Sequence, residues 1–230
     1  MTTDERTRRE WRRRRGLASE LYKPDTVRLV IVGEAPPPER FFYFGDSLFF
    51  RYLARAFAPM VGEAVAGDAG QFLAVYRALG GWRMDICREP QRAGKGGADD
   101  VSPCMGVFLH DWNRLPLVAE PLVIVSPKRL YDKLPPVLQR QVTGMVPPPG
   151  QWNAHRVAFL RDMDELLTTF IGRETIADAA HGVDADDAAL DFEIARACAD
   201  GTDEREMARL IIGHPREAAL RRAWEDKETI

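Results

Sequence analysis

The sequence predicts an α/β fold: a three-layer α/β/α sandwich with a central, mostly parallel sheet and a C-terminal helical extension. Two short apolar runs rich in β-branched residues, Val27–Val32 and Leu122–Ser126, are typical of strands buried on both faces, as in parallel sheets. Segments with helical periodicity alternate with the expected strands, and this order also favours a parallel sheet. We therefore expect the two runs to lie side by side, or nearly so, at the centre of the sheet.

The elements between these runs follow from helix caps, apolar periodicity and chain breakers. Asp46 or Ser47 can cap a helix whose apolar side chains recur at i, i+4 and i+8, and this helix should end before Pro59. A second helix over residues 71–79 is expected to stop at a Gly-Gly pair, because glycine is favoured just past a helix end. Residues 82–87 form the next expected strand.

Beyond the second buried run, we expect one short strand and then helices. The strand, residues 142–146, is ended by a Pro-Pro-Pro-Gly segment. Apolar side chains between Val157 and Phe170 repeat with a helical period and predict a long helix. After Glu174, two further apolar periods predict an added subdomain of two or three helices.

The composition is that of a soluble, enzyme-sized protein. A chain of 230 residues, 45% of them apolar, can bury one large core. No apolar run approaches the roughly 20 residues that span a bilayer, and the N-terminus lacks the apolar segment of a secretory signal. We therefore expect a cytoplasmic protein with no membrane partner. No sequence pattern indicates a metal or a cofactor.

The cysteines carry no recognisable pattern. Cys87, Cys104 and Cys198 are widely spaced and form no Cys-x-x-Cys motif. This spacing predicts neither a disulfide framework nor a zinc site. We expect all three side chains to be buried apolar fillers.

Charge divides the chain into three parts: a basic arm over 1–20, a main domain over 21–173 and an acidic helical extension over 174–230. The formal net charge is −3, but the extension holds 15 Asp+Glu against 7 Lys+Arg, and could recruit a protein partner. The arm surrounds Trp11 and could track phosphates, although a solvated helix or a lid anchored by Trp11 would explain it equally. The expected phosphate contacts are Arg12, Arg13, Arg14 and Arg15.

The loop after the first buried run, Gly33-Glu34-Ala35-Pro36, is the main candidate for a ligand site. It places a carboxylate at the carboxyl end of a central strand, where open α/β sheets bind ligands. The prolines hold the loop extended, and Phe41, Phe42 and Tyr43 follow it. A fixed carboxylate that faces aromatic walls suits a flat ring. The alternative role of this carboxylate is to cap the next helix.

This loop resembles the first motif of the uracil-DNA glycosylase superfamily, in the branch where that motif is Gly-Glu-Ala-Pro-Gly. The resemblance implies that Glu34 positions a water or stabilises a sugar cation, and that Phe42 or Tyr43 stacks on an extruded base. Pro37 stands where the branch has glycine. The branch commonly holds a four-cysteine iron–sulfur cluster, which three cysteines cannot form. The implied base pocket also includes Gly33, Ala35 and Pro36.

The later strand ends extend the resemblance in part. The base-reading position corresponds to Asp85, which could accept a hydrogen bond from the base, although an ion pair with Arg83 or Arg88 is the alternative. Where the family has His-Pro-Ser, this chain has Gln151-Trp152-Asn153-Ala154-His155, so His155 would have to supply the imidazole. The other implied contacts are Gln151, Asn153 and Ser126 for the base and Lys128 for phosphate.

Three hypotheses of function follow. The first is hydrolysis of the N-glycosidic bond of a damaged or non-standard base in DNA, which needs a carboxylate near the sugar and donors near the base. The second is non-catalytic binding of a nucleotide or nucleic acid in the same pocket. The third is an interaction scaffold that acts through the acidic extension. The first two require Glu34, Asp85, an aromatic ring and a donor from 151–155 to converge on one cleft.

Overall fold

The computed structural model describes residues 3–90, 100–150 and 152–225. Within these residues the centre of the fold is an all-parallel sheet of four strands in the order β2-β1-β3-β4. The two apolar runs are neighbours at the centre of this sheet, so the predicted α/β sandwich is confirmed. The strands are β1 (Val27–Gly33), β2 (Gly81–Asp85), β3 (Leu117–Val125) and β4 (Gly144–Met145).

The other elements are helices and short 3-10 turns that connect or follow the strands. In chain order they are α1 (Thr3–Leu21), η1 (Phe42–Phe44), α2 (Leu48–Val61), α3 (Glu63–Gly67), α4 (Ala69–Ala78), η2 (Ser102–Cys104), α5 (Met105–Trp112), η3 (Lys128–Lys133), α6 (Pro136–Gln139), α7 (Asn153–Phe170), α8 (Arg173–His181), α9 (Ala185–Asp200), α10 (Glu204–Ile211) and α11 (Glu217–Glu225).

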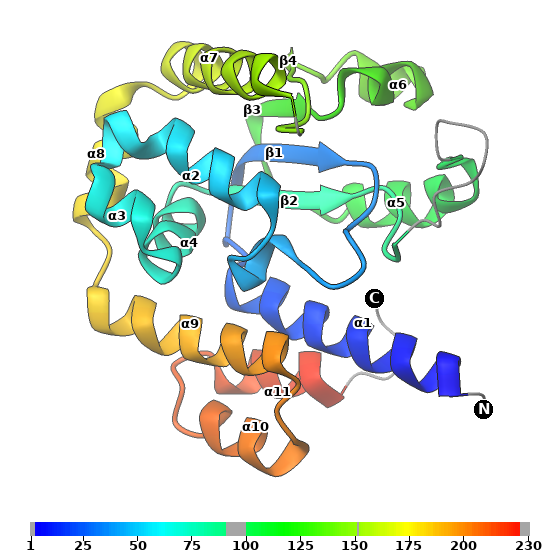
Figure 1. Ribbon diagram of the computed structural model, residues 1–230, viewed down its shortest axis with the longest axis vertical. Coiled ribbons are helices and arrows are strands. Elements are labelled where there is room, and N and C mark those ends of the chain that lie inside the picture. Colours follow the sequence, from blue (N-terminus) through cyan, green and yellow to red (C-terminus); the bar gives the residue numbers. More distant parts are fainter. Residues whose placement is uncertain (1–2, 91–99, 151, 226–230) are drawn as a thin grey trace.

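Helices cover both faces of the sheet (Figure 1). Leu29 and Ile31 of β1 are buried in one core, which they share with α2, α4 and α7. Val30 and Val32 are buried in a second core, together with apolar side chains of α5, η3 and α6. A strand buried on both faces explains why its sequence is a continuous apolar run rather than an alternating one.

Local signals account for both ends of α2. Ser47 caps α2, because its Oγ accepts a hydrogen bond from the Phe50 N–H at 3.1 Å. We expected this helix to end before Pro59, but it continues to Val61. A proline this close to a helix end removes only one backbone hydrogen bond, and the helix stops at Gly62, whose φ of 88° favours glycine.

The arginine-rich N-terminal segment forms α1, which packs against α9 and α11 of the C-terminal extension (Figure 1). Its inner face buries Leu17, Ala18 and Leu21 completely. The first and last segments of the chain are therefore in contact with each other. None of the described helices combines the length and the apolar character that crossing a membrane requires.

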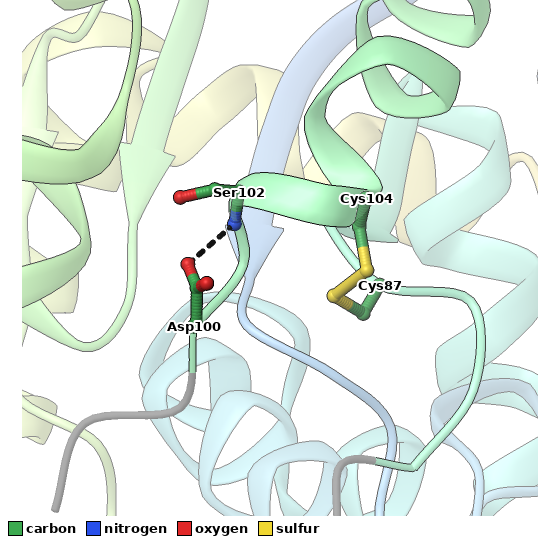
Figure 2. Close-up of a disulfide and its surroundings, with 4 residues drawn as sticks. All are labelled: Cys87, Asp100, Ser102 and Cys104. Atoms are coloured by element: carbon green, nitrogen blue, oxygen red, sulfur yellow. Dashed lines mark hydrogen bonds between the residues drawn. A yellow bond between two sulfur atoms is a disulfide. The ribbon is translucent and has the colours of Figure 1, made fainter.

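Cys87 and Cys104 form a disulfide, so the expectation that all three cysteines are free fillers is wrong (Figure 2). The bond joins the segment after β2 to the residue before α5, across 17 positions of the chain. A single pair at this separation gives no motif that the sequence could reveal. Cys198 is free and buried, as expected, and burial raises the pKa of its thiol to about 12.

Candidate functional site

Glu34 lies at the carboxyl end of β1 and is neutralised by two cations. Its Oε2 accepts a hydrogen bond from Arg129 Nη2 at 2.6 Å, and its Oε1 lies 3.4 Å from Lys133 Nζ. Both partners belong to η3, which packs on the second core. The side chain is only 13% exposed, so these contacts occupy most of its accessible surface. A carboxylate bound in this way is a structural tie between β1 and η3.

Asp85 lies on the opposite face of the sheet and is also paired. Its Oδ1 is 2.9 Å from Arg83 Nη2, and the two side chains are 9% and 11% exposed. A Cβ placed on Gly33 would meet this Oδ1 at 2.0 Å, so glycine provides the space for the Asp85 carboxylate. Along β1, position 33 shares a face with Ile31, whereas position 34 shares a face with Val32. The expected convergence of Glu34 and Asp85 on one cleft is therefore wrong.

Phe42 and Tyr43 are packed in the core, and both also contribute to the lining of the cavity described below. They belong to the turn η1 and are 2% and 1% exposed. The Tyr43 hydroxyl accepts a hydrogen bond from the Arg83 N–H at 2.8 Å and donates to its carbonyl at 3.2 Å, which closes the outer edge of β2. Burial raises the pKa of Tyr43 well above its usual value. A 3-10 turn directs three consecutive rings inward, whereas an extended segment would have turned at least one ring outward.

The remaining residues expected at the base do not form one pocket together with both carboxylates. Ser126 is buried at the end of β3, and its Oγ has no hydrogen-bond partner among the described residues. Asn153 and His155 are exposed on the first turn of α7. Within the described ranges, no hydrogen bond or ion pair joins either of them to Glu34 or Asp85. Gln151 lies outside the described residues. Ala35 is half-buried against the second core, and Pro36 lines the cavity described below.

The basic residues expected to contact phosphate are mostly engaged within the protein. Arg13 lies over the Trp224 ring at 3.6 Å and donates to Glu204 at 2.6 Å. The other contacts are Arg12 with Glu89 at 3.1 Å, Arg14 with Glu10 at 3.0 Å and Lys128 with Asp162 at 3.3 Å. The N-terminal segment is therefore a packed helix, and of its four expected phosphate contacts only Arg15 lines a cavity.

A cavity of about 640 Å³ lies along β2, the edge strand of the sheet. Helices α1 and α11 line one side, and the end of α5 with the residues after it lines the other. Two half-buried rings, Phe41 and Trp82, contribute to its wall. Its charged lining comprises six cations, Arg15, Lys23, Arg83, Arg88, Arg114 and Arg222, and three carboxylates, Glu20, Asp85 and Asp111.

The carboxylates of this cavity are all paired, but several cations are not. Asp85 pairs with Arg83, Asp111 with Arg88, and Glu20 with Lys23. In the part of the chain that the structure describes, no carboxylate lies within ion-pair distance of the other three cations. These three cations are Arg15, Arg114 and Arg222.

Arg15 is the least exposed of these cations. Its Nη2 donates to the carbonyls of Pro37 and Pro38 at 2.8 and 3.0 Å, and its guanidinium lies 5.6 Å from the centre of the Phe41 ring. Burial lowers the pKa of Arg15. Its Nε and the Nη1 of Arg83 are buried without an acceptor among the described residues. Buried donors without acceptors are unfavourable, so these two guanidinium groups have hydrogen-bonding capacity that the described residues leave unused.

Sequence reasoning missed this cavity, although one signal for it was present. Trp11, Arg15, Ala18 and Tyr22 follow each other at helical spacing, so the arginine sits within a largely apolar stripe. An arginine on the buried face of a helix indicates a specific acceptor or a ligand.

Searches against protein-family models, curated proteins and solved structures found no match to this chain. The geometry described above is therefore the basis for assigning a function.

Proposed function

We propose that the protein binds a nucleotide, either free or as part of a nucleic-acid strand, in the cavity beside β2. The observation that carries the proposal is the combination of half-buried aromatic rings with arginines for which the described residues provide no carboxylate partner. Bases stack on aromatic side chains, and guanidinium groups bind phosphate oxygens through paired N–H donors. The volume of about 640 Å³ falls in the range of small-molecule sites.

Binding has better support than base excision. Excision requires a carboxylate that is free to act on water or on the sugar, and Glu34 is held by Arg129 and Lys133. Excision also requires donors beside the departing base, and the exposed Asn153 and His155 make no contact with that carboxylate within the described ranges. Hydrolysis of a base therefore remains a prediction from the resemblance alone.

The test is a binding titration with ligands that separate the two sources of a nucleotide. AMP, GMP, CMP and UMP represent the free form, and fluorescein-labelled single- and double-stranded oligonucleotides represent the strand. Arg222→Glu should weaken binding roughly tenfold, because it reverses a cation of the cavity. Arg205→Glu is the matched control, since this exposed arginine of α10 does not line the cavity. If none of these ligands binds, or if the two variants have equal effects, the proposal is refuted.

The same protein can be tested for base excision. Oligonucleotides that carry uracil, hypoxanthine or xanthine are incubated with it, and abasic sites are scored after alkali treatment. We expect no abasic product. Product that is lost in Glu34→Gln would instead support excision.

A further inference from the structure

The cavity follows β2 from one end of the strand to the other. At the carboxyl end of the sheet it is lined by Cys87, whose N–H donates to the carbonyl of Glu34 at 2.9 Å. At the amino end it is lined by Arg114, which lies just before the point where Leu117 pairs with Val27 at the start of β1. A ligand that fills the cavity therefore extends along the edge strand.

Two half-buried rings of the cavity form separate stacking surfaces. Phe41 and Trp82 each contact the buried ring of Tyr43, at centroid distances of 5.6 and 5.3 Å. Among the described residues, no ring contact joins Phe41 directly to Trp82. Phe41 comes just before η1 and lies beside Arg15, whereas Trp82 is the second residue of β2. Aromatic side chains arranged along a groove bind successive bases of a strand.

Helix α11 adds a second cation to the end of the cavity that holds the buried arginine of α1. The two helices run antiparallel: Arg13 Nε donates to the Trp224 carbonyl at 2.7 Å, and Arg216 Nη1 donates to the Leu21 carbonyl, also at 2.7 Å. Arg222 is much nearer along α11 to the first of these contacts than to the second. It therefore lies level with the buried arginine, and the two guanidinium groups can bind the same phosphate.

The amino end of the cavity has cations of its own. Arg114 follows α5 and is exposed, and its Nη1 lies 3.5 Å from the Nε2 of His110. Lys23 lines the same end, where its Nζ lies 3.8 Å from a carboxylate oxygen of Glu20. Cations thus occupy both ends of the cavity, and Trp82 lies between them.

We infer that the cavity binds two successive nucleotides of a single nucleic-acid strand, an inference that rests on the proposed nucleotide binding. One base stacks on Phe41 and the next on Trp82. One phosphate is bound by Arg15 and Arg222, and a second by Arg114. A mononucleotide occupies one ring and one group of cations, so it leaves the rest of this lining unused. The bases of a duplex are paired and stacked on one another, so they reach neither ring without unpairing.

The first experiment is a length series, measured by isothermal titration calorimetry with the full-length protein. The ligands are thymidine 5′-monophosphate and the 5′-phosphorylated dinucleotide and trinucleotide of thymidine. The dinucleotide should bind at least about tenfold more tightly than the mononucleotide, because it adds a second base and a second phosphate. The third nucleotide should add less than about threefold, because both half-buried rings are already occupied. The corresponding uridylate series distinguishes RNA from DNA as the source of the strand.

The second experiment removes one stacking surface. Trp82→Leu should weaken dinucleotide binding by roughly fivefold but mononucleotide binding by less than about twofold, because a mononucleotide still stacks on Phe41. Trp152→Leu is the matched control, since this tryptophan is 73% exposed before α7 and does not line the cavity. Circular dichroism confirms that each variant is folded. Dinucleotides that lack one base should bind the wild-type protein roughly fivefold more weakly, a measurement that needs no variant.

The outcomes separate the inference from the proposed function. Equal affinity for the mononucleotide and the dinucleotide would overturn the inference and leave nucleotide binding intact. An equal gain in affinity with every added nucleotide would overturn it too, because the strand would then follow an extended charged surface. Tighter binding of a duplex than of its single strands would have the same consequence. If no ligand of either series binds, the proposed function is overturned, and the inference with it.

Discussion

Charged side chains gather in two regions of this molecule, at the carboxyl end of β1 and in the cavity beside the edge strand β2. The two regions differ in how many of these side chains are paired within the protein. At the end of β1, one carboxylate, Glu34, forms ion pairs with two cations of η3. In the cavity beside β2, six cations meet three carboxylates, and Arg15, Arg114 and Arg222 have no carboxylate partner in the described ranges. A motif at a strand end therefore does not locate the ligand by itself. The pairing of its neighbours determines which charges remain available.

The two regions should differ most in how much each contributes to the free energy of unfolding. The cavity wall is tied by a covalent bond, and the end of β1 is tied by ion pairs. Reduction of the disulfide should lower the free energy of unfolding by about 3 kcal/mol, because it frees a loop of 17 residues in the unfolded chain. Urea denaturation with and without dithiothreitol measures this change. A change below about 1 kcal/mol would mean that the bond does not constrain the unfolded chain.

A second comparison uses two exposed arginines, one from each region. Arg114→Glu should weaken nucleotide binding by roughly tenfold, because it replaces a cation of the cavity with an anion. Arg129→Glu, the matched change beside Glu34, should alter affinity by less than about twofold. Titrations at low salt measure both constants. A larger effect of Arg129→Glu would indicate that the ligand binds at the end of β1.

A third comparison concerns the aromatic wall. Phe41→Leu keeps much of the apolar volume but removes the ring, so nucleotide affinity should fall by roughly fivefold. Phe170→Leu is its control, since this side chain is 54% exposed at the end of α7 and does not line the cavity. The same fluorescence titration serves for both variants. If both leave affinity unchanged, Phe41 does not stack on the base.

The smallest effect is expected at Glu34, in the loop after β1. Glu34→Gln should lower the free energy of unfolding by about 1 kcal/mol or less, because its cationic partners keep access to water. It should leave nucleotide affinity unchanged. Thermal denaturation and the binding titration measure the two quantities. A strong loss of binding in this variant would contradict the division between the two regions.

The sequence predicted the parts of the fold that depend on local pattern. The apolar runs in β1 and β3, and the cap at Ser47, have their causes within a few residues of chain. The disulfide was not predictable, because its two cysteines come together only when α5 returns to the end of β2. The inward turn of Phe42 and Tyr43 was missed because an extended chain was assumed where the backbone forms a 3-10 turn.

The candidate site was predictable only in part. Pro36, Phe42, Tyr43 and Asp85 are expected at a ligand and do line the cavity, and Arg15, which is expected at a phosphate, lines it too. Their partners Phe41, Trp82, Arg114 and Arg222 come from four separate elements of the chain, and no spacing in the sequence links them. Which carboxylates are neutralised is also a property of tertiary contacts. The sequence offered Arg83 as an ion-pair partner of Asp85, and the structure confirms that pair, but nothing in the sequence linked Arg129 and Lys133 to Glu34.

The most direct test of the cavity as the nucleotide site is photo-crosslinking with 8-azidoadenosine 5′-triphosphate, followed by mass spectrometry of the labelled peptides. The cavity beside β2 predicts labelling of peptides that contain Phe41 or Trp82, with competition by unmodified ATP and roughly tenfold less labelling in Arg222→Glu. Labelling confined to residues 126–133, next to Glu34, would place the ligand at the end of β1 and contradict the account.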